Sequence, residues 1–332
     1  MTQNYLDVYK NKNILITGGL GFIGSTIARR LVGIAKEITL VDSLIPQYGG
    51  NLFNIDGIQD KVNVNIADVR DEASMNALVK NKHFLFNMAG TLSHIDSMTD
   101  PYTDLEINCR SQLTILEACR KNNRDIKIVL AGTRGEYGRI ETSPVDESHP
   151  LQPTDVNGIN KIAGGLYHLV YNNAYGIRSA SIRLTNTYGP RHQMRHSKQG
   201  YLNWFLRLAM EDQDITIYDN GTPKRDFIYV DDAVEAFLMV CASDKTNGEF
   251  YNLGSGEGVS ILESAEAVIK ASGSGRIKHV EYPKEKKAIE IGDFIADYSK
   301  IEKLVGWKPT VSFEDGLKKS YEFYKKYREY YW

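Results

Sequence analysis

The segment Gly18-Gly19-Leu20-Gly21-Phe22-Ile23-Gly24 spaces its glycines in a way that suits binding of a diphosphate. It lies between a short apolar run, typical of a buried strand, and a stretch whose apolar residues recur with helical spacing. Gly18 permits a tight turn, Gly21 lets the backbone approach the ligand, and Gly24 lets the helix pack on the strand. Free N–H groups and the dipole at a helix start attract anions. We therefore predict that a dinucleotide pyrophosphate is bound by Gly18, Gly21, Phe22, Ile23 and Gly24.

An acidic residue follows the turn at the distance where such sites bind the adenosine ribose. Asp42 lies 18 residues after Gly24, at the end of the predicted strand 37–42. It is placed to accept hydrogen bonds from the ribose hydroxyls and to repel a 2′-phosphate, which favours NAD over NADP. Asp68 and Val69 follow the next predicted strand and are expected to contact the adenine. For Asp68, a helix N-cap is the alternative interpretation.

Short apolar runs alternate with helical stretches around these residues, and this alternation favours parallel strands joined by right-handed crossovers. The sequence therefore predicts an α/β fold, with a doubly wound parallel Rossmann sheet and a smaller C-terminal α/β substrate lobe. Turn signals become frequent after about residue 190. We expect residues 1–190 to form the dinucleotide-binding domain, with some later segments returning to it, and 191–332 to form mainly the substrate lobe. The predicted strands are 13–17, 37–42, 61–67, 83–89, 125–131 and 179–184, and the predicted helices include 22–35, 105–121 and 161–175.

Composition narrows the possible partners. The chain has 332 residues and a formal net charge of −2, so no global positive field attracts nucleic acid or anionic lipid, and we expect neither partner. The N-terminal segment is polar and no run approaches the ~20 apolar residues of a membrane span. Three cysteines without a C-x-x-C pair indicate buried thiols in a reducing compartment, and we expect a cytoplasmic protein. The seven histidines lack metal-ligand spacing, so no metal is predicted.

Further motifs follow the glycine turn in a definite order. They include Asn87-Met88-Ala89-Gly90, the segment 133–138 and Leu184-Thr185-Asn186-Thr187-Tyr188-Gly189-Pro190-Arg191. The segments 224–232, 251–254 and 292–293 continue the series. Over nearly the whole chain, these motifs resemble the extended short-chain dehydrogenase/reductase family, whose members modify nucleotide-linked sugars.

The resemblance implies a shared opening step with NAD as the cofactor and a nucleotide-diphosphate sugar as the substrate. A sugar hydroxyl, usually at C4, loses its proton to the protein and its hydride to NAD. The matching positions place Asn87 and Ala89 beside the cofactor. They also place Thr133 at the reacting oxygen and Lys161 on the nicotinamide ribose.

The substrate and the oligomeric state are implied in the same way. Asn186, Arg225 and Arg191 match family positions that bind the substrate, and a guanidinium suits bidentate contact with phosphate. For Arg225, an ion pair with a neighbouring Asp is the alternative. Members of the family pair two long helices across a two-fold axis, so we expect a homodimer. Packing of both helices on the sheet alone is the alternative.

One departure from the family affects the chemistry directly. The family carries a tyrosine and a lysine as YxxxK, whereas the matching residues here are Asn157 and Lys161. A tyrosine beside a lysine can act as a base, but an amide does not titrate. Asn157 could still orient a hydroxyl or a water. The possible substitute bases are Glu136, Asp155, His94 and Tyr188, and the sequence does not choose among them.

A second departure concerns the residues after Thr133. Family dehydratases and decarboxylases carry a carboxylate there, whereas this chain has Arg134 and Gly135. A standard dehydratase is therefore disfavoured, and an epimerase or a dehydrogenase/keto-reductase acting at C4 is expected. The alternative is a catalytically silent protein that binds NAD and a nucleotide sugar after losing the tyrosine.

Overall fold

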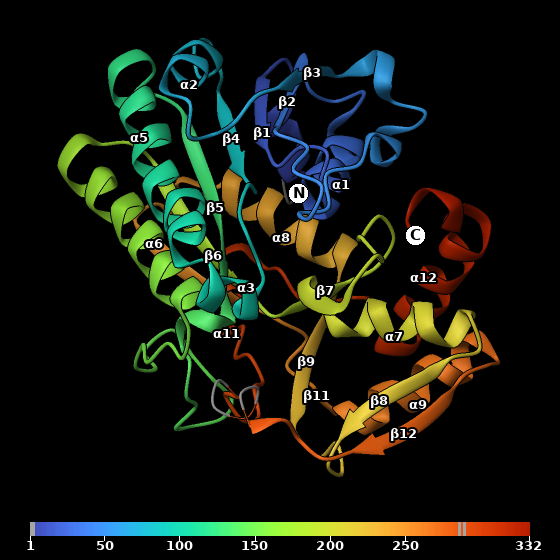
Figure 1. Ribbon diagram of the computed structural model, residues 1–332. Coiled ribbons are helices and arrows are strands. Elements are labelled where there is room, and N and C mark those ends of the chain that lie inside the picture. Colours follow the sequence, from blue (N-terminus) through green and yellow to red (C-terminus); the bar gives the residue numbers. More distant parts are fainter. Residues whose placement is uncertain (1–3, 285–286, 288–289) are drawn as a thin grey trace.

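The computed structural model describes residues 4–284, 287 and 290–332. Seven parallel strands form the central sheet in the order β10-β6-β5-β4-β1-β2-β3 (Figure 1). The chain passes from β1 outward to β3 and then returns to the other side of β1 as β4. Open α/β sheets bind ligands at the carboxyl ends of the strands beside such a reversal. The strands are β1 (Asn13–Thr17), β2 (Glu37–Asp42), β3 (Asn63–Ile66), β4 (Phe84–Asn87), β5 (Lys127–Thr133), β6 (Ser179–Leu184) and β10 (Glu249–Leu253).

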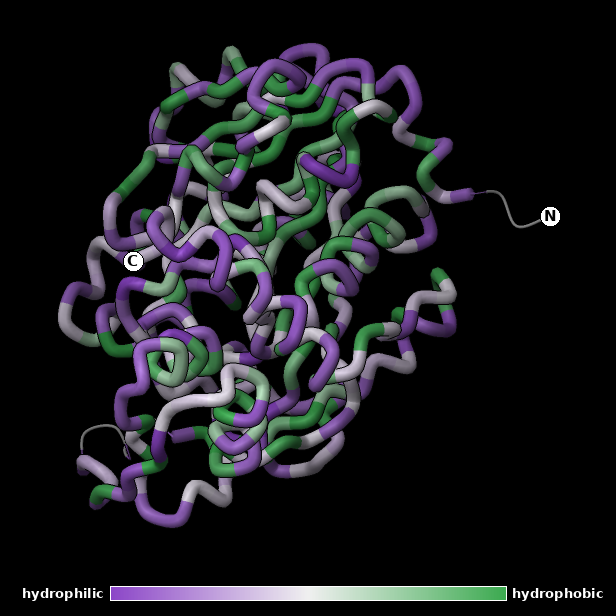
Figure 2. Tube along the Cα trace, turned by 90° about the vertical axis from the view of Figure 1, so that its right-hand side faces the viewer, coloured by the Kyte–Doolittle hydropathy of each residue, from purple (hydrophilic) through white to green (hydrophobic). Residues whose placement is uncertain are grey.

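Helices cover both faces of this sheet. Ile14 and Ile16 of β1 pack in the core on one face, whereas Leu15 belongs to the core on the other, as expected for a strand buried on both sides. Figure 2 shows hydrophobic segments inside the upper half of the molecule and hydrophilic ones around its periphery. One face carries α1 (Phe22–Leu31) and α8 (Val230–Ala242), and the other carries α2 (Glu72–Leu78), α5 (Ser111–Asn122) and α6 (Val156–Tyr175).

The segment between β4 and α5 forms short helices at the edge where the strands end. These are α3 (His94–Thr99), α4 (Pro101–Leu105) and a π-helical turn, Glu106–Arg110. Ser93 caps α3 by accepting a hydrogen bond from the Asp96 N–H at 3.1 Å. A 3₁₀ turn, Arg134–Glu136, follows β5 at the same edge.

A smaller lobe lies below the sheet in Figure 1. The chain enters this lobe directly after β6, where β7 pairs in parallel with β9. The lobe contains the strands β7 (Asn186–Tyr188), β8 (Asp214–Tyr218), β9 (Lys224–Tyr229), β11 (Gly258–Ser260) and β12 (Arg276–Val280), and the helices α7 (Tyr201–Met210), α9 (Ile261–Ser272) and α12 (Phe313–Tyr327). The short helix α11 (Ser299–Val305) packs instead against β10 and α8 of the sheet domain.

The predicted α/β fold with its doubly wound parallel sheet is confirmed. The predicted helix 105–121 is in fact the end of α4, the π-helical turn and most of α5. β10 and α8 lie beyond residue 190 in the chain, yet β10 pairs with β6 and α8 packs on the sheet. None of the described helices is long and apolar enough to cross a membrane.

Candidate functional site

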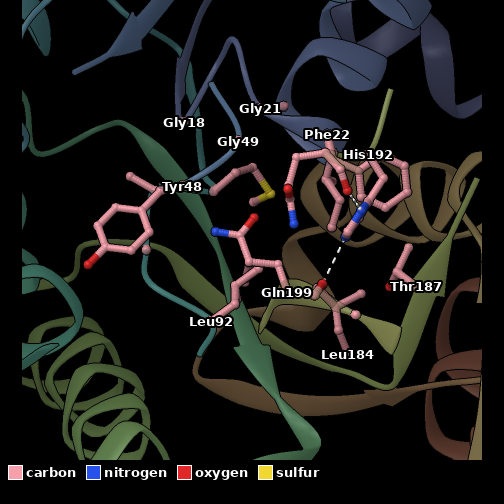
Figure 3. A pocket seen from close by; sticks show the side chains of 18 of the residues that line it. Gly18, Gly21, Phe22, Tyr48, Gly49, Leu92, Leu184, Thr187, His192 and Gln199 are labelled. Carbon is pink, nitrogen blue, oxygen red and sulfur yellow. Dashed lines mark hydrogen bonds between the residues drawn. The ribbon is translucent and has the colours of Figure 1, made fainter. Parts of the chain in front are cut away.

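A cavity of about 390 Å³ opens where the strand order reverses, at the carboxyl ends of the central strands. It extends from the glycine turn past Thr133 to β7 and the start of α7. Figure 3 shows Phe22 and His192 together on one side of it, with Tyr48 and Leu92 on the other. One continuous space therefore joins the predicted dinucleotide site to the C-terminal lobe.

The glycine turn forms a cradle that side chains would fill. Gly18 has a φ of +61°, and a Cβ atom on it would lie 2.9 Å from the Ala89 nitrogen. A Cβ atom on Gly24 would lie 2.2 Å from the Gly18 carbonyl oxygen and would push α1 off the turn. Gly21, Phe22 and Gly24 line the cavity at the start of α1, together with Ile23. The backbone there fits a pyrophosphate group.

The residues predicted for the adenosine half lie at the ends of β2 and β3 and line the cavity. Asp42 accepts hydrogen bonds from the N–H groups of Leu20 (3.1 Å) and Leu44 (2.9 Å). Burial raises its pKa, and these two backbone bonds oppose the shift. Asp68 and Val69 also line the cavity. The Asp68 carboxylate forms a two-bond ion pair with Arg70, so that hydrogen bonding lowers its pKa.

The predicted nicotinamide residues divide into two groups. Ala89 and Lys161 line the cavity, whereas Asn87 is fully buried behind it. The Asn87 side chain accepts a hydrogen bond from Thr17 at 2.7 Å and donates one to Gln112 at 2.7 Å. The Lys161 ammonium reaches the Ala131 carbonyl at 3.4 Å, and burial lowers its pKa. Lys161 thus remains available to a ligand, while Asn87 supports the end of β4.

Thr133 lies at the end of β5 and lines the cavity. The hydroxyl accepts the Gly135 N–H at 3.2 Å, and the Thr133 N–H donates to Glu136 at 3.0 Å. These bonds form a capping box that fixes the turn after β5. The Thr133 hydroxyl can therefore still hydrogen-bond a substrate oxygen.

Asn157 lies outside the cavity lining, although it is one helical turn from Lys161. Its amide donates to the Thr91 carbonyl at 3.1 Å and to Asp104 at 2.9 Å. Asn160 donates to the other oxygen of Asp104 at 2.8 Å. The amide of Asn157 is thus engaged in a buried polar network and is not directed at the reacting centre.

The predicted substrate residues are not all brought together. Asn186 lines the cavity, whereas Arg225 and Arg191 do not. Arg225 is 5% exposed and forms an ion pair with Glu290 at 2.5 Å. The alternative prediction for Arg225 is an ion pair with a neighbouring Asp, so the ion pair is present but with a different carboxylate. The Arg191 guanidinium lies over the ring of Phe323. Of the three, only Asn186 is in place to contact a substrate.

Arg134 lies at the cavity but is not among the residues predicted from the sequence to bind a ligand. Arg134 lines the cavity, and its guanidinium donates to Asn186 at 3.4 Å. Burial, reinforced by the nearby charge of Arg225, lowers its pKa to about 10. Its position directly after Thr133 was a signal, but the sequence could not tell which way the side chain turns. A partly buried cation here suits an anionic group of a ligand.

Three of the four candidate bases are engaged in other interactions. Glu136 is buried and pairs with Arg183 at 2.7 Å. Tyr188 directs its hydroxyl to the Phe313 carbonyl at 3.1 Å, and burial raises its pKa. Asp155 caps α6 and contacts His94, which lines the cavity. Among the described residues, no group of three or more His, Cys, Asp or Glu could hold a metal ion.

The chain matches the family described as GDP-mannose 4,6-dehydratase over residues 15–320. It therefore belongs to the extended short-chain dehydrogenase/reductase family of NAD-dependent nucleotide-sugar epimerases and dehydratases, and the predicted membership is confirmed.

Individual relatives catalyse different reactions on this scaffold. The UDP-N-acetyl-α-D-glucosaminuronate decarboxylase of Bacillus cytotoxicus is 30% identical over 324 residues, covering 95% of this chain and 98% of the relative. The UDP-glucose 4-epimerase of Thermotoga maritima, solved with UDP-glucose, is 27% identical, with a TM-score of 0.87 and coverage of 95% and 99%. The UDP-glucose 4-epimerase of Thermus thermophilus, solved with NAD, is 28% identical, with a TM-score of 0.83 and coverage of 94% and 99%.

Proposed function

We propose that this protein is an NAD-dependent 4-epimerase of a nucleotide-diphosphate sugar. The observation that carries the proposal is the continuous cavity, which joins the glycine turn to the C-terminal lobe past Thr133 and Lys161. A cofactor and a sugar bound in one cavity can exchange a hydride directly, because no wall separates them.

Bound NAD supplies an acceptor and later a donor of hydride. The protein residues hold and orient it. The proposed contacts are the glycine turn with the pyrophosphate, Asp42 with the adenosine ribose, Asp68 and Val69 with the adenine, and Ala89 and Lys161 with the nicotinamide half.

On the substrate side, we assign the reacting oxygen to Thr133 and an anionic group, such as the diphosphate, to Arg134 and Asn186. Arg225 can contact the diphosphate only if its ion pair with Glu290 opens. Arg191 can do so only if its guanidinium leaves Phe323.

An epimerase suits the side chains that line the cavity better than a dehydratase does. Among the described lining residues, the only carboxylates are Asp42 and Asp68, which lie at the ends of β2 and β3. Loss of water from a sugar requires an acid or base near C5 and C6, and Arg134 and Gly135 follow Thr133 instead. Inversion at C4 requires only that the 4-keto sugar rotates in the site, so that the hydride returns to the opposite face of the carbonyl.

We also propose a homodimer formed through α4 and α6. Ile159, Leu166 and Val170 share one face of α6 and are 55%, 44% and 54% exposed. Tyr102 on the adjacent α4 is 78% exposed. A second copy of the chain would cover this apolar face. The buried free thiols of the described cysteines fit a reducing compartment, and we propose the cytoplasm.

The test combines purified protein with UDP-, dTDP-, GDP- and CDP-linked hexoses. The bound nicotinamide is identified after acid release, its redox state is followed by absorbance, and products are examined by proton NMR. We expect bound NAD, transient reduction with one nucleotide class, and a product inverted at C4.

Net consumption of NAD, with a keto sugar released, would instead identify a dehydrogenase. If no sugar changed the redox state of the bound cofactor, the proposed enzymatic function would be wrong.

A further inference from the structure

Removal of a hydride from a sugar hydroxyl requires an acceptor for the hydroxyl proton. Position 157 supplies none, because Asn157 does not titrate and its amide is bonded to Thr91 and Asp104. The acceptor must lie close to Thr133 and open to the cavity.

His94 satisfies both conditions. It lines the cavity at the start of α3. A Cβ atom built on Gly135 would lie 3.1 Å from Cε1 of His94 and 3.6 Å from Oγ1 of Thr133, so the imidazole and the hydroxyl flank one point. The imidazole therefore stands next to the residue assigned to the reacting oxygen.

The imidazole is held from behind by a buried carboxylate. Nδ1 of His94 lies 2.6 Å from Oδ2 of Asp155, whose side chain is only 4% exposed. The other oxygen, Oδ1, accepts the Gly158 N–H at 2.8 Å, which fixes the carboxylate at the start of α6. Burial opposes ionisation of Asp155, but the bonds from His94 and Gly158 hold its pKa below the usual value. An ionised Asp155 accepts a hydrogen bond from Nδ1–H of the neutral ring. The proton therefore stays on Nδ1, and the free lone pair of the ring is on Nε2.

We propose that His94 is the acid–base residue of this site and that Asp155 is its positioning residue. The inference rests on the proposed function, since a sugar hydroxyl must be the group that reacts. Among the described residues, Nε2 of His94 makes no hydrogen bond, and it is the ring nitrogen remaining for a substrate.

The proton would leave the hydroxyl oxygen, and the hydride would leave the carbon that bears it, by separate routes. Nε2 of His94 would take the hydroxyl proton, and the C–H hydrogen would leave as a hydride, for which bound NAD would be the acceptor. The O–H and C–H bonds break and a C=O bond forms, so the alcohol becomes a ketone. The resulting imidazolium is stabilised by Asp155. On the return step, the hydride re-forms the C–H bond and His94 gives its proton back to the oxygen, so no further reactant is required.

Other ionisable groups near the cavity are less suitable. The Lys161 ammonium already bears its full complement of protons while it is charged. Tyr48 also lines the cavity, but burial and the carboxylates of Asp96, Asp100 and Asp104 raise its pKa, which disfavours its phenolate. Glu136 is committed to Arg183.

The first test compares His94→Gln with His279→Gln. His279 is an exposed histidine on β12 whose Nδ1 contacts the Asp219 carbonyl, so the matched variant removes an imidazole outside the cavity lining. We expect His94→Gln to retain bound NAD and a folded circular dichroism spectrum, yet to reduce the cofactor about 10²- to 10⁴-fold more slowly. His279→Gln should match the wild type.

The second test is chemical rescue. His94→Ala leaves space at a partly exposed site, so added imidazole should restore part of the lost rate. The same imidazole should leave the wild type and His279→Gln unaffected.

The third test measures the effect of Asp155 on the tautomer of His94 and requires no catalytic turnover. In protein labelled with [¹⁵N]histidine, NMR of wild type should show His94 with its proton on Nδ1. Asp155→Asn keeps a residue able to cap α6 but removes the charge that fixes the tautomer, so the Nε2-protonated form should gain population. His279 should keep its spectrum in this variant.

The outcomes distinguish failure of the His94 assignment from failure of the proposed function. Wild-type activity that persists in His94→Gln, or that is lost in Tyr48→Phe but not in His94→Gln, overturns the assignment of His94 alone. A His94 ring protonated on Nε2 in the wild type also overturns it. If none of the tested sugars reduces the cofactor bound to the wild type, the proposed function and the assignment of His94 are both overturned.

Discussion

At the scale of single residues, the proposed cofactor site depends both on glycines, which leave room for a ligand, and on a charged side chain. Gly24 has no room for a methyl group because the Gly18 carbonyl would lie 2.2 Å away. Asp42 contributes in the opposite way, by bringing a carboxylate to the end of β2. Each can be tested separately.

Gly24→Ala should abolish stable NAD binding and lower stability by about 1–3 kcal/mol, as overpacking does. The measurements are the nicotinamide content after gel filtration and the Tm. Gly57→Asn is a matched control, because Gly57 is exposed, has a φ of +78° and has no atom within 4 Å of its Cβ position. Full NAD occupancy in Gly24→Ala would contradict the assignment of the turn.

Asp42→Asn should weaken NAD binding about tenfold to a hundredfold, because a hydrogen bond to a charged acceptor contributes about 1.5–3 kcal/mol. Discrimination against NADP should fall, since the repulsion of the 2′-phosphate is lost. Calorimetric titration of both dinucleotides checks this. Asp56→Asn, at an exposed turn, should change neither affinity. Unaltered preference for NAD in Asp42→Asn would count against its role at the ribose.

At the scale of elements, α6 connects the site to the rest of the fold. Its N-cap, Asp155, lies behind His94, its second turn carries Lys161 at the cavity, and its later residues pack against α5. Near its C-terminal end, the Tyr171 hydroxyl donates to Glu117 of α5 at 2.7 Å, and Arg120 pairs with the same carboxylate. The α5–α6 contact therefore contains an ionised group.

Glu117→Gln should destabilise the protein at neutral pH but not in acid. The Arg120 bond lowers the pKa of Glu117 from 4.5 to about 2 in the folded state. A depressed folded-state pKa contributes stability above the unfolded value and loses it as the pH falls through the window from 4.5 to about 2. The Tm difference between variant and wild type should therefore shrink across that window. The exposed Glu281→Gln serves as the control, and a Tm gap independent of pH would refute the expectation.

At the scale of the whole molecule, the site needs both the sheet and the lobe. The sheet brings the glycine turn, Thr133 and Lys161 to one edge, and β7 carries Asn186 from the lobe to the same cavity. The exposed apolar residues of α4 and α6 lie outside this cavity. The short helix α3, which carries His94 at the cavity, contacts both helices. The proposed role of the exposed apolar residues is assembly.

Val170→Glu should convert the proposed dimer into monomers, because a charge would be buried between two copies of α6. Sedimentation velocity measures this directly. Leu52→Glu places the same charge at a 57% exposed apolar residue away from α4 and α6 and should leave the mass unchanged. A wild type that sediments as a monomer would remove the basis for the dimer.

The sequence by itself determined six strands of the sheet, the glycine turn and the family, but not the seventh strand, β10. Local periodicity locates strands and helices, and the turn is a contiguous segment whose geometry depends on its own glycines. Asp42 could be placed from its spacing alone, because it ends the strand that follows the turn.

Only the tertiary structure decided which distant side chains meet. His94 and Asp155 are 61 residues apart in the chain, yet their atoms lie within 2.6 Å. Arg225 matches a family substrate-binding position but is bonded to Glu290 and lies outside the cavity lining, whereas Arg134 lines the cavity. The physical reason is that side-chain direction and partner choice are set by packing between elements, which no local pattern encodes.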